Sequence, residues 1–490
     1  METIQLKTVD PVSQDLLRLA AKKTISLNWE RYEKLQPQDG FLRLGLSCPY
    51  GCMQGPCRID PFERGPEKGV CGIERKEMVA AMLLRLCLQG AMEAIQGLAS
   101  AEMTPNVTFS NGLNQLVSGA MANLGNRQLS VSEVFYGASL LQRPAASYIE
   151  LVRQALRLSL LSIGALDQTL KENSSGTLLC QAGYGLVAGN HLNIGLAGRL
   201  PREFIETLQQ EAAGDSAGTV RMVSLGDWIA LEDRYVPFVC TSGEAELLVS
   251  SGAIHLLIAG TDHDPGLTAV SEKMEVPVMK WDRGLAPKDV LERARHQHAT
   301  ASRKSPLSDS SLKGEGRVIN STQELVARFK ENFSGRMVLI GGCDTLRQPF
   351  GYLPVELTVA FRGEGYQVGG WGDAALWMIK DGLASAQNDS PVHILPQQEG
   401  PLMALKALEA VGKRNNLSGI CFTGLRDCLD FSNALGLAVL GCPVCLADPI
   451  PVWGSQAVRE LLAEALKNNG GQLMHADHPV TAQEILEWLQ

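Results

Sequence analysis

Residues 337–344 read Met-Val-Leu-Ile-Gly-Gly-Cys-Asp, a short apolar run that ends in a loop with two glycines and an aspartate. A run of this kind, bounded by turn residues and followed by a helical pattern, is typical of a buried strand in a parallel sheet. Comparable runs occur at 185–188, 236–239, 253–259 and 419–422. The repetition of this unit after about residue 176 predicts α/β architecture around parallel sheets.

The first third of the chain has a different periodicity. Apolar residues recur every three or four positions, most clearly over 15–23 and 77–98, which predicts helices. The polar stretch 298–317 is rich in Ser and Lys and indicates a linker. We therefore expect an α + α/β fold: a helical domain over 1–175 and two Rossmann-like α/β domains over 176–312 and 313–490.

Composition narrows the class of protein. The 490 residues are 45% hydrophobic and 20% charged, with a formal net charge of −9 and no basic region, which argues against nucleic-acid binding. Residues 1–10 are polar and contain no signal-peptide core. The longest apolar stretch, 434–447, has 14 residues, whereas a bilayer span needs about 20. We expect a cytoplasmic protein that binds no membrane.

Four of the twelve cysteines lie close together in the pattern Cys48-x3-Cys52-x4-Cys57-x13-Cys71, within a loop rich in glycine and proline. Disulfides rarely persist in the cytoplasm, so a group of this kind indicates a metal site. Four thiolates from one loop suit a [4Fe–4S] cluster, with glycines that allow close backbone approach. Zinc is the competing metal, although zinc sites usually combine two close ligand pairs across a longer gap. Four unrelated buried thiols are the remaining interpretation.

The segments 29–41 (Trp-Glu-Arg-Tyr-Glu-Lys-Leu-Gln-Pro-Gln-Asp-Gly-Phe), 44–48, 55–62 and 65–72 resemble the anaerobic nickel–iron carbon monoxide dehydrogenases, which are related to the hybrid-cluster (prismane) proteins. The resemblance is dense over 10–93 and continues beyond it as isolated motifs. It implies that the four cysteines hold an electron-relay cluster. It also implies a homodimer that exchanges electrons with a ferredoxin-like partner.

This chain departs from the family pattern around that loop. The family has two residues between the first two cluster cysteines, and here there are three. Asp39 and Ser47 occupy the positions at which the family places the two cysteines of a subunit-bridging cluster. Carboxylate and hydroxyl groups are poor ligands for iron–sulfur clusters. A dimer without a bridging cluster is therefore expected.

The resemblance also implies a second metal cluster between the domains. Its ligands would come from loops at the carboxyl ends of strands, where open α/β sheets place their sites. Four residues match in order and local context: His191, Cys240, Cys343 and Cys428. A single cysteine after a strand is more often a small core residue, so the prediction depends on the four occurring together.

Other catalytic positions of the family have changed. Asp262 or His263 stands where the family has one cysteine ligand. The segment that aligns with a second cysteine-bearing loop of the family, 369–373, contains no cysteine. The catalytic lysine falls at Ser455 or Gln456, and the histidine-rich run at 92–96 contains no histidine. Nickel–iron chemistry needs soft ligands and a cation that stabilises developing charge, so these changes argue against efficient CO oxidation.

Several residues are candidate substitutes. Cys442 and Cys445 form a C-x-x-C pair that would ligate iron or act as a redox dithiol, unless both belong to the core. Asp262 and His263 suit iron–oxo chemistry, unless they belong to a solvated loop. The other cysteines in apolar runs, at 87, 180 and 421, are expected to be packing residues.

The sequence thus predicts an iron–sulfur oxidoreductase on a carbon monoxide dehydrogenase-like scaffold. Electrons would pass from a [4Fe–4S] cluster to a divergent second Fe–S or Fe–S–O cluster, with or without nickel, that binds a small inorganic or one-carbon molecule. Two alternatives stay open. One is genuine CO/CO₂ interconversion, and the other is a non-catalytic electron-transfer or sensor protein.

Overall fold

The computed structural model describes residues 6–35, 40–62, 64–98, 107, 109–125, 128–142, 144–172, 176–189, 191–213, 220–300, 307, 314–333, 335–384 and 391–490. Its centre is one sheet of thirteen strands in the order β13-β12-β11-β8-β9-β10-β7-β1-β4-β3-β2-β5-β6. The strands are β1 Thr177–Ala182, β2 Leu192–Ala197, β3 Val220–Leu225, β4 Phe238–Cys240, β5 Leu256–Ala259, β6 Val278–Lys280, β7 Gly314–Ile319, β8 Met337–Gly341, β9 Gln367–Gly370, β10 Val392–Ile394, β11 Leu417–Phe422, β12 Pro443–Leu446 and β13 Gln472–His475.

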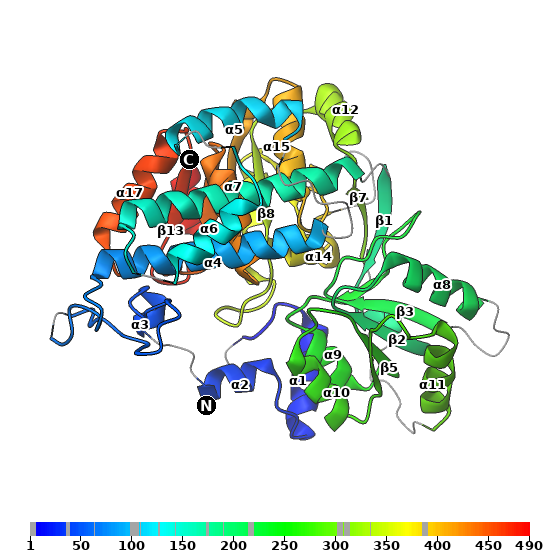
Figure 1. The fold of residues 1–490 in the computed structure, drawn as a ribbon. Helices are drawn as coiled ribbons and strands as arrows, with labels where there is room; N and C mark the ends of the chain where they lie inside the picture. Colours follow the sequence, from blue (N-terminus) through cyan, green and yellow to red (C-terminus); the bar gives the residue numbers. More distant parts are fainter. Residues whose placement is uncertain are drawn as a thin grey trace.

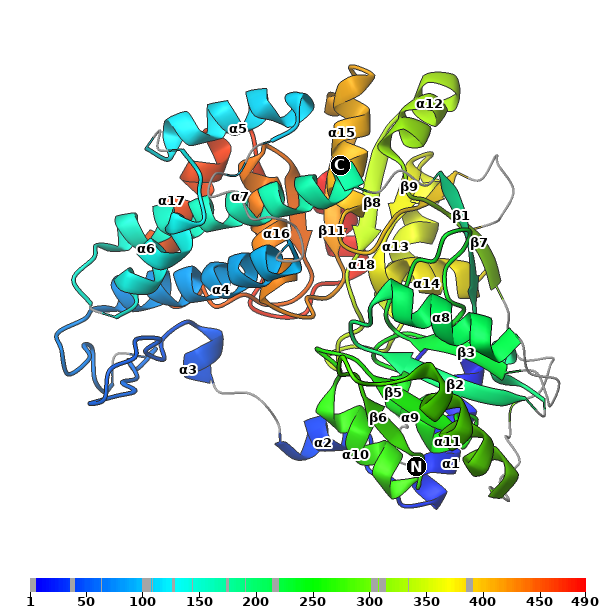
Figure 2. The same cartoon turned by 45° about the vertical axis from the view of Figure 1, so that its right-hand side comes forward.

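Helices cover both faces of this sheet (Figures 1 and 2). They are α1 Pro11–Lys22, α2 Asn28–Leu35, α3 Gly40–Arg43, α4 Arg75–Leu98, α5 Asn111–Asn123, α6 Ser132–Leu140, α7 Tyr148–Glu172, α8 Arg202–Ala213, α9 Ala245–Ser251, α10 Pro265–Lys273, α11 Pro287–Thr300, α12 Thr322–Asn332, α13 Tyr352–Gly363, α14 Gly372–Lys380, α15 Gly400–Ala410, α16 Cys428–Val439, α17 Gln456–Lys467 and α18 Ala482–Leu489. The expected α + α/β class is confirmed.

The sheet consists of two parallel halves that join at one antiparallel pair, β1 with β7. Within each half the strands are parallel, and central strands such as β2 and β8 are buried along their whole length. Burial on both faces explains why these strands are continuous apolar runs in the sequence. The predicted linker, 298–317, overlaps both neighbouring elements, because α11 ends at Thr300 and β7 begins at Gly314.

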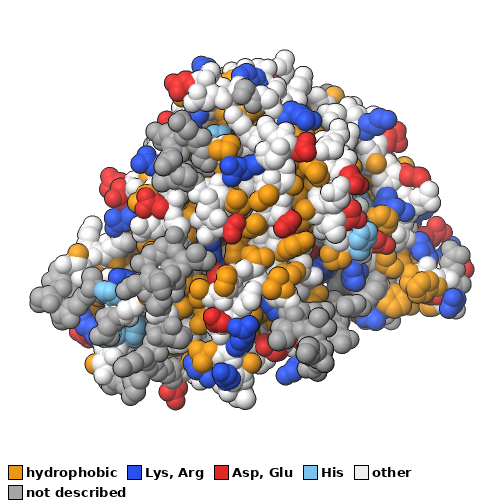
Figure 3. Space-filling view, turned by 180° about the vertical axis from the view of Figure 1, so that it is seen from behind, with side chains coloured by type: hydrophobic (Ala, Val, Ile, Leu, Met, Phe, Trp, Pro, Cys, Tyr) orange, Lys and Arg blue, Asp and Glu red, His pale blue; other side chains and the backbone are white. Residues whose placement is uncertain are grey.

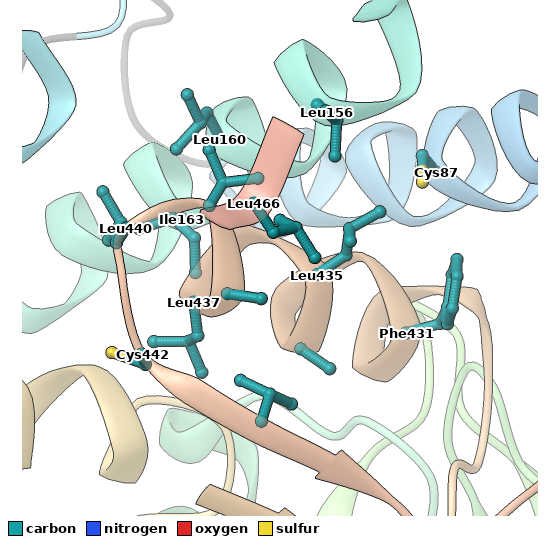
Figure 4. Close-up of a cluster of buried hydrophobic side chains, with 14 of the residues drawn as sticks. Cys87, Leu156, Leu160, Ile163, Phe431, Leu435, Leu437, Leu440, Cys442 and Leu466 are labelled. Atoms are coloured by element: carbon teal, nitrogen blue, oxygen red, sulfur yellow. The ribbon is translucent and has the colours of Figure 1, made fainter. Parts of the chain in front are cut away.

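A helical layer of α4, α7 and α16 lies against the second half of the sheet (Figure 4). Helix α16 is almost entirely buried and fits closely under α4. A Cβ atom at Gly90 of α4 would lie 2.2 Å from the carbonyl oxygen of Cys428 and 2.5 Å from the Cβ of Ser432. The absence of a side chain at Gly90 therefore sets the spacing of the two helices.

Helix α4 is also long and apolar enough to cross a membrane by length and composition. The stretch Arg75–Gln96 has 22 residues, and an 18-residue window of it has a mean hydropathy of 1.5. Within the protein, 67% of that window is buried. A helix in the core of a soluble protein can be as apolar as a membrane span, because neighbouring elements and not water surround it.

Helices α1 and α2 lie apart from this layer and pack on α9 and α10 of the first half (Figure 2). A buried ion-pair cluster fixes α1 there. Lys380 Nζ lies 2.7 Å from Asp10 Oδ2 and 2.9 Å from Glu244 Oε2. Asp10 in turn caps α1 by accepting from the amide of Val12 at 2.8 Å. The cluster thus ties the start of α1 to both halves of the sheet.

One predicted strand is absent. The apolar run 185–188 was expected to be a strand, but Tyr184–Val187 form a 3-10 turn, and the strand begins later, at Leu192. Short apolar runs do not distinguish a strand from a buried helical turn. This one-element shift changes the position of His191, as described below.

Candidate functional site

The cysteine loop folds back on itself between residues 46 and 59. The amide of Cys48 donates to the carbonyl of Cys57 at 2.8 Å, and that of Ile59 donates to the carbonyl of Leu46 at 3.0 Å. Cys48 and Cys57 are half-buried, whereas Cys52 and Cys71 are exposed. The loop therefore holds four thiols at the protein surface, just before α4.

Backbone amides already point at two of these sulfur atoms. The amide of Val70 donates to Cys57 Sγ at 3.4 Å, and that of Gln54 donates to Cys52 Sγ at 3.4 Å. Gly69 lies against Cys57, where a Cβ atom would be 3.6 Å from Sγ. Burial and the neighbouring charges of Cys57 and Cys71 raise the pKa of the Cys48 thiol, against hydrogen bonds from the backbone that lower it. A bound cation would hold all four thiols as thiolates.

This donor set fits a [4Fe–4S] cluster. It offers four thiols, glycines that allow the backbone close approach, and amides that donate to sulfur. The side chains are not closed around a common centre, since no group of three or more His, Cys, Asp and Glu in the described part of the chain is arranged to hold a metal ion. Of the two positions matched to a bridging cluster, Ser47 pairs with Arg58 in a β-bridge, and Asp39 lies outside the described residues.

The second candidate site lies where loops from the two halves of the sheet meet. Ser242, after β4, donates to Asp373 Oδ2 at 2.6 Å, and Asp373 lies at the start of α14, after β9. Trp228, after β3, approaches Gln397, after β10. Loops that follow strands thus converge, as expected for an α/β protein.

A small cavity lies at this meeting point. Its volume of about 20 Å³ is room for about one water-sized molecule. The lining includes Ser242, Cys343, Asp373, Gln397, Arg426 and Asp430. Cys343 is the only one of the four predicted cluster ligands among these lining residues.

Arg426 lines the cavity, and a second arginine, Arg199, lies close enough for both guanidinium groups to act on the charge of Asp227. Arg199, just after β2, contacts Glu93 of α4 at 2.7 Å and Asp262 at 3.0 Å. Arg426 contacts Asp427 at 3.2 Å and lies 3.8 Å from Asp227. Guanidinium groups are always charged, so two fixed cations are already held where loops of both halves converge.

Neither arginine was predicted from the sequence as a site residue. A signal was present for Arg426, because the segment 423–430 carries two residues more than the motif that it resembles, and Arg426 and Asp427 lie there. Glu93 and Arg199 carry no local signal, because their pairing depends on where α4 crosses the end of β2.

His191 does not join this site. It precedes β2, whereas Cys240 ends β4. The registers of β2 with β3 and of β3 with β4 place Cys240 in the row of Ala197. His191 lies six residues earlier, roughly 20 Å along the strands. The expectation that His191 and Cys240 share one metal cluster is therefore corrected.

Cys240 and Cys428 do not line the cavity either. Cys240 is 1% exposed and packs among apolar residues of α1, α9 and β3. Burial, and then the charge of Glu244, raises the pKa of its thiol well above the ordinary value. Cys428 Sγ lies 3.3 Å from Gln89 Oε1 of α4, on the side of α16 that faces that helix.

The residues predicted as substitute ligands also have separate partners and do not come together in one site. Asp262 is paired with Arg199, and His263 Nδ1 is bonded to the carbonyl of Gly260 at 2.8 Å. Cys442 packs in the cluster under α16, whereas Cys445 packs with α13, α14 and α18 on the opposite face of the sheet. Cys442 and Cys445 are therefore not positioned to form a dithiol with each other.

Asp430 provides a pH test of this site. Burial and the charge of Asp427 raise the pKa of Asp430 to about 7. Because the unfolded value is near 4, the folded protein holds the extra proton between pH 4 and 7, and stability falls as the pH rises through that window. Asp430→Asn removes this titration. We expect the stability of the variant in urea, measured relative to the wild type, to rise by about 2–3 kcal/mol between pH 5 and pH 8. A difference that does not change with pH would contradict the buried carboxyl.

Comparison with known proteins gives two kinds of similarity. Carbon monoxide dehydrogenase 1 of Carboxydothermus hydrogenoformans is 49% identical over 84 residues, which are 17% of this chain and 13% of that protein. For carbon monoxide dehydrogenase 1 of Methanosarcina mazei the identity is 48% over 85 residues, again 17% and 13% of the two chains. The matched segment thus spans about an eighth of the length of these relatives. No family model matches the chain.

The structural similarity extends over the whole chain. Carbon monoxide dehydrogenase IV from Carboxydothermus hydrogenoformans superposes with a TM-score of 0.82 at 18% identity, covering 99% of this chain and 98% of that one. A nickel-free carbon monoxide dehydrogenase from Thermococcus sp. AM4 gives a TM-score of 0.80 at 18% identity, covering 99% and 96%. At this identity the likeness establishes the fold alone.

Proposed function

We propose that this chain, which has the fold of the carbon monoxide dehydrogenases and is up to 49% identical to them over 84 residues, is a member of their superfamily and an iron–sulfur oxidoreductase that moves electrons through its N-terminal cysteine loop. Cys48, Cys52, Cys57 and Cys71 would hold a [4Fe–4S] cluster, which supplies one-electron transfer when bound. The single observation that carries the proposal is the loop itself, with four surface thiols and amides directed at their sulfur atoms. In this loop the chain is also most similar to its named relatives.

For the second site, the geometry favours the electron-transfer or sensor alternative over a second metal cluster. Arg426 in the lining, and Arg199 beside it, are each paired with carboxylates, so these side chains are engaged with each other and are not arranged as a set of metal ligands. Of the four predicted ligands, Cys343 alone lines the cavity. The cavity would admit about one water-sized molecule, held by Arg426 and the surrounding amide and carboxyl groups.

Genuine CO/CO₂ interconversion is the second candidate, supported by the names of the relatives. The residues at the second site do not fit a nickel–iron cluster, because thiolates do not gather there. No step of that chemistry is therefore assigned to this chain.

Metal analysis of anaerobically purified protein separates these functions. We expect about four irons per chain, as one cube requires, nickel well below one per chain, and CO oxidation with a viologen acceptor at least 100-fold slower than by an efficient enzyme. About eight irons would support the second cluster instead. Nickel near one per chain together with rapid turnover would replace the proposal with CO dehydrogenase activity.

We further propose a homodimer in the cytoplasm that exchanges electrons with a ferredoxin-like partner. Hydrophobic side chains are concentrated across the middle of the face opposite to that in Figure 1 (Figure 3), which supports a covered surface. Met53, Phe62 and Val70 expose 94%, 73% and 81% of their surface around the cysteine loop, which supports docking of the partner there. Light scattering of the same sample should give the mass of two chains, and the mass of one chain would contradict the dimer.

A further inference from the structure

Three sulfur atoms lie in one row across the second half of the sheet. Cys421 of β11 is in register with Cys445 of β12. Cys445 is in register with Met474 of β13, the strand at the edge of the sheet. Cys and Met account for only 12 and 14 of the 490 residues, so such a row is not what composition alone would produce.

The three side chains share one face and contact each other. All three belong to the hydrophobic cluster under α13, α14 and α18. Cys421 and Cys445 are adjacent, as register partners on neighbouring strands, and their thiols interact electrostatically. Cys445 Sγ lies 3.6 Å from Met474 Sδ.

These spacings suit a metal ion with sulfur ligands. Neighbouring strands lie about 4.8 Å apart, so two side chains in register hold their sulfur atoms at a similar separation. A metal–thiolate bond of about 2.3 Å places two sulfurs on one ion about 4–4.6 Å apart. Only small rotations of the side chains are needed to bring Cys421 and Cys445 to this separation.

Thiolate and thioether are soft ligands that suit Cu(I), and a single positive charge is matched by one thiolate. We propose that Cys421, Cys445 and Met474 form a binding site for a monovalent soft metal ion, Cu(I) or its analogue Ag(I). Binding replaces one thiol proton: Cu⁺ plus two thiols gives a neutral Cu(thiolate)(thiol) unit and releases H⁺. No electron is transferred. A neutral unit suits the apolar surroundings, where a net charge would be costly.

Met474 gives the ion a route to this buried pair. Cys421 is 1% exposed and Cys445 0%, whereas Met474 is half-buried on the edge strand. A flexible thioether at the surface receives the ion first, and Cys445 lies within contact distance to take it over. The row thus runs from the edge of the sheet to its interior.

The test uses anaerobic protein with its iron–sulfur cluster in place and one equivalent of Cu(I) held by a coloured chelator. We expect the wild type to withdraw the ion from the chelator. Cys421→Ala and Cys445→Ala should each weaken binding at least tenfold, and Met474→Leu a few-fold. X-ray absorption of the copper in the wild type should show sulfur neighbours only, at about 2.2–2.3 Å.

Two matched variants control for general thiol chemistry. Cys180→Ala removes another buried strand cysteine of the same hydrophobic cluster, and Cys442→Ala removes the C-x-x-C neighbour of Cys445. Both should bind Cu(I) like the wild type, and the iron content should not change on copper addition. Equal affinity in Cys421→Ala and the wild type, nitrogen or oxygen neighbours of the copper, or release of iron would each overturn the site. The X-ray absorption result on the wild type applies even if an alanine variant fails to fold.

Discussion

Replacing Lys380 with methionine should lower the free energy of unfolding by about 3–5 kcal/mol. The ammonium lies between two carboxylates in the interior, with side-chain exposures of 3% for Lys380, 1% for Asp10 and 0% for Glu244. Removing the cation leaves both carboxylates buried without their partner, which costs far more than the loss of an exposed pair. The amides of α1 should also exchange hydrogen faster, because Asp10 caps that helix.

Urea denaturation and hydrogen–deuterium exchange of peptides over 11–22 measure these two effects. Arg18→Met is the matched control on the same helix, since its ion pair with Asp15 is exposed on both sides and should contribute less than about 1 kcal/mol. Adding Asp10→Asn and Glu244→Gln to Lys380→Met should restore part of the stability, because the unpaired charges are removed. A Lys380→Met protein as stable as Arg18→Met would refute the buried cluster.

Cys57→Ala should abolish the cluster of the N-terminal loop. Cys57 pairs through its backbone with Cys48, accepts the amide of Val70 and lies against Gly69, so it occupies the middle of the loop. A cube left with three thiolates is open to solvent. We expect iron to fall from about four to below one per chain, with loss of the broad absorbance near roughly 400 nm that thiolate-bound iron produces.

Cys87→Ala serves as the control for this variant. Cys87 is fully buried in α4, where burial raises the pKa of its thiol to about 12, and its Sγ accepts a hydrogen bond from Ser159 Oγ at 3.4 Å. That variant should keep its iron and its spectrum. Retention of iron in Cys57→Ala would show that the loop does not hold the cluster in the way proposed.

Much of the fold was predictable because burial is periodic in this sequence. The strands around 337–340 and 419–422 and the helix over 77–98 appear within a few residues of the expected bounds. The packing of α1 on α9 was not predictable, since it depends on Lys380, which lies hundreds of residues from its partner Asp10. Local patterns contain no information on such a contact.

The same contrast between local patterns and distant contacts applies to the two candidate sites. The cysteine loop was predictable because its four thiols lie within one short segment. The second site was not, because its composition depends on where separate strands end. His191 lies at the wrong end of β2 because 184–187 is a helical turn. Cys445 lies beside Cys421 on one face of the sheet, whereas Cys442 precedes β12 and packs on the other face.

The ends of the thirteen-stranded sheet limit how copies of this protein can polymerise. An open sheet has only two free edges, and each is a template for strand addition from another molecule. Here β6 at one edge has three residues and ends in the exposed Lys280, and β13 at the other has four and begins with the exposed Gln472. Edges this short and polar offer few backbone groups to a second sheet. Growth into fibres by edge-to-edge pairing of sheets is therefore disfavoured. Copies of the protein would instead contact each other through their helical faces.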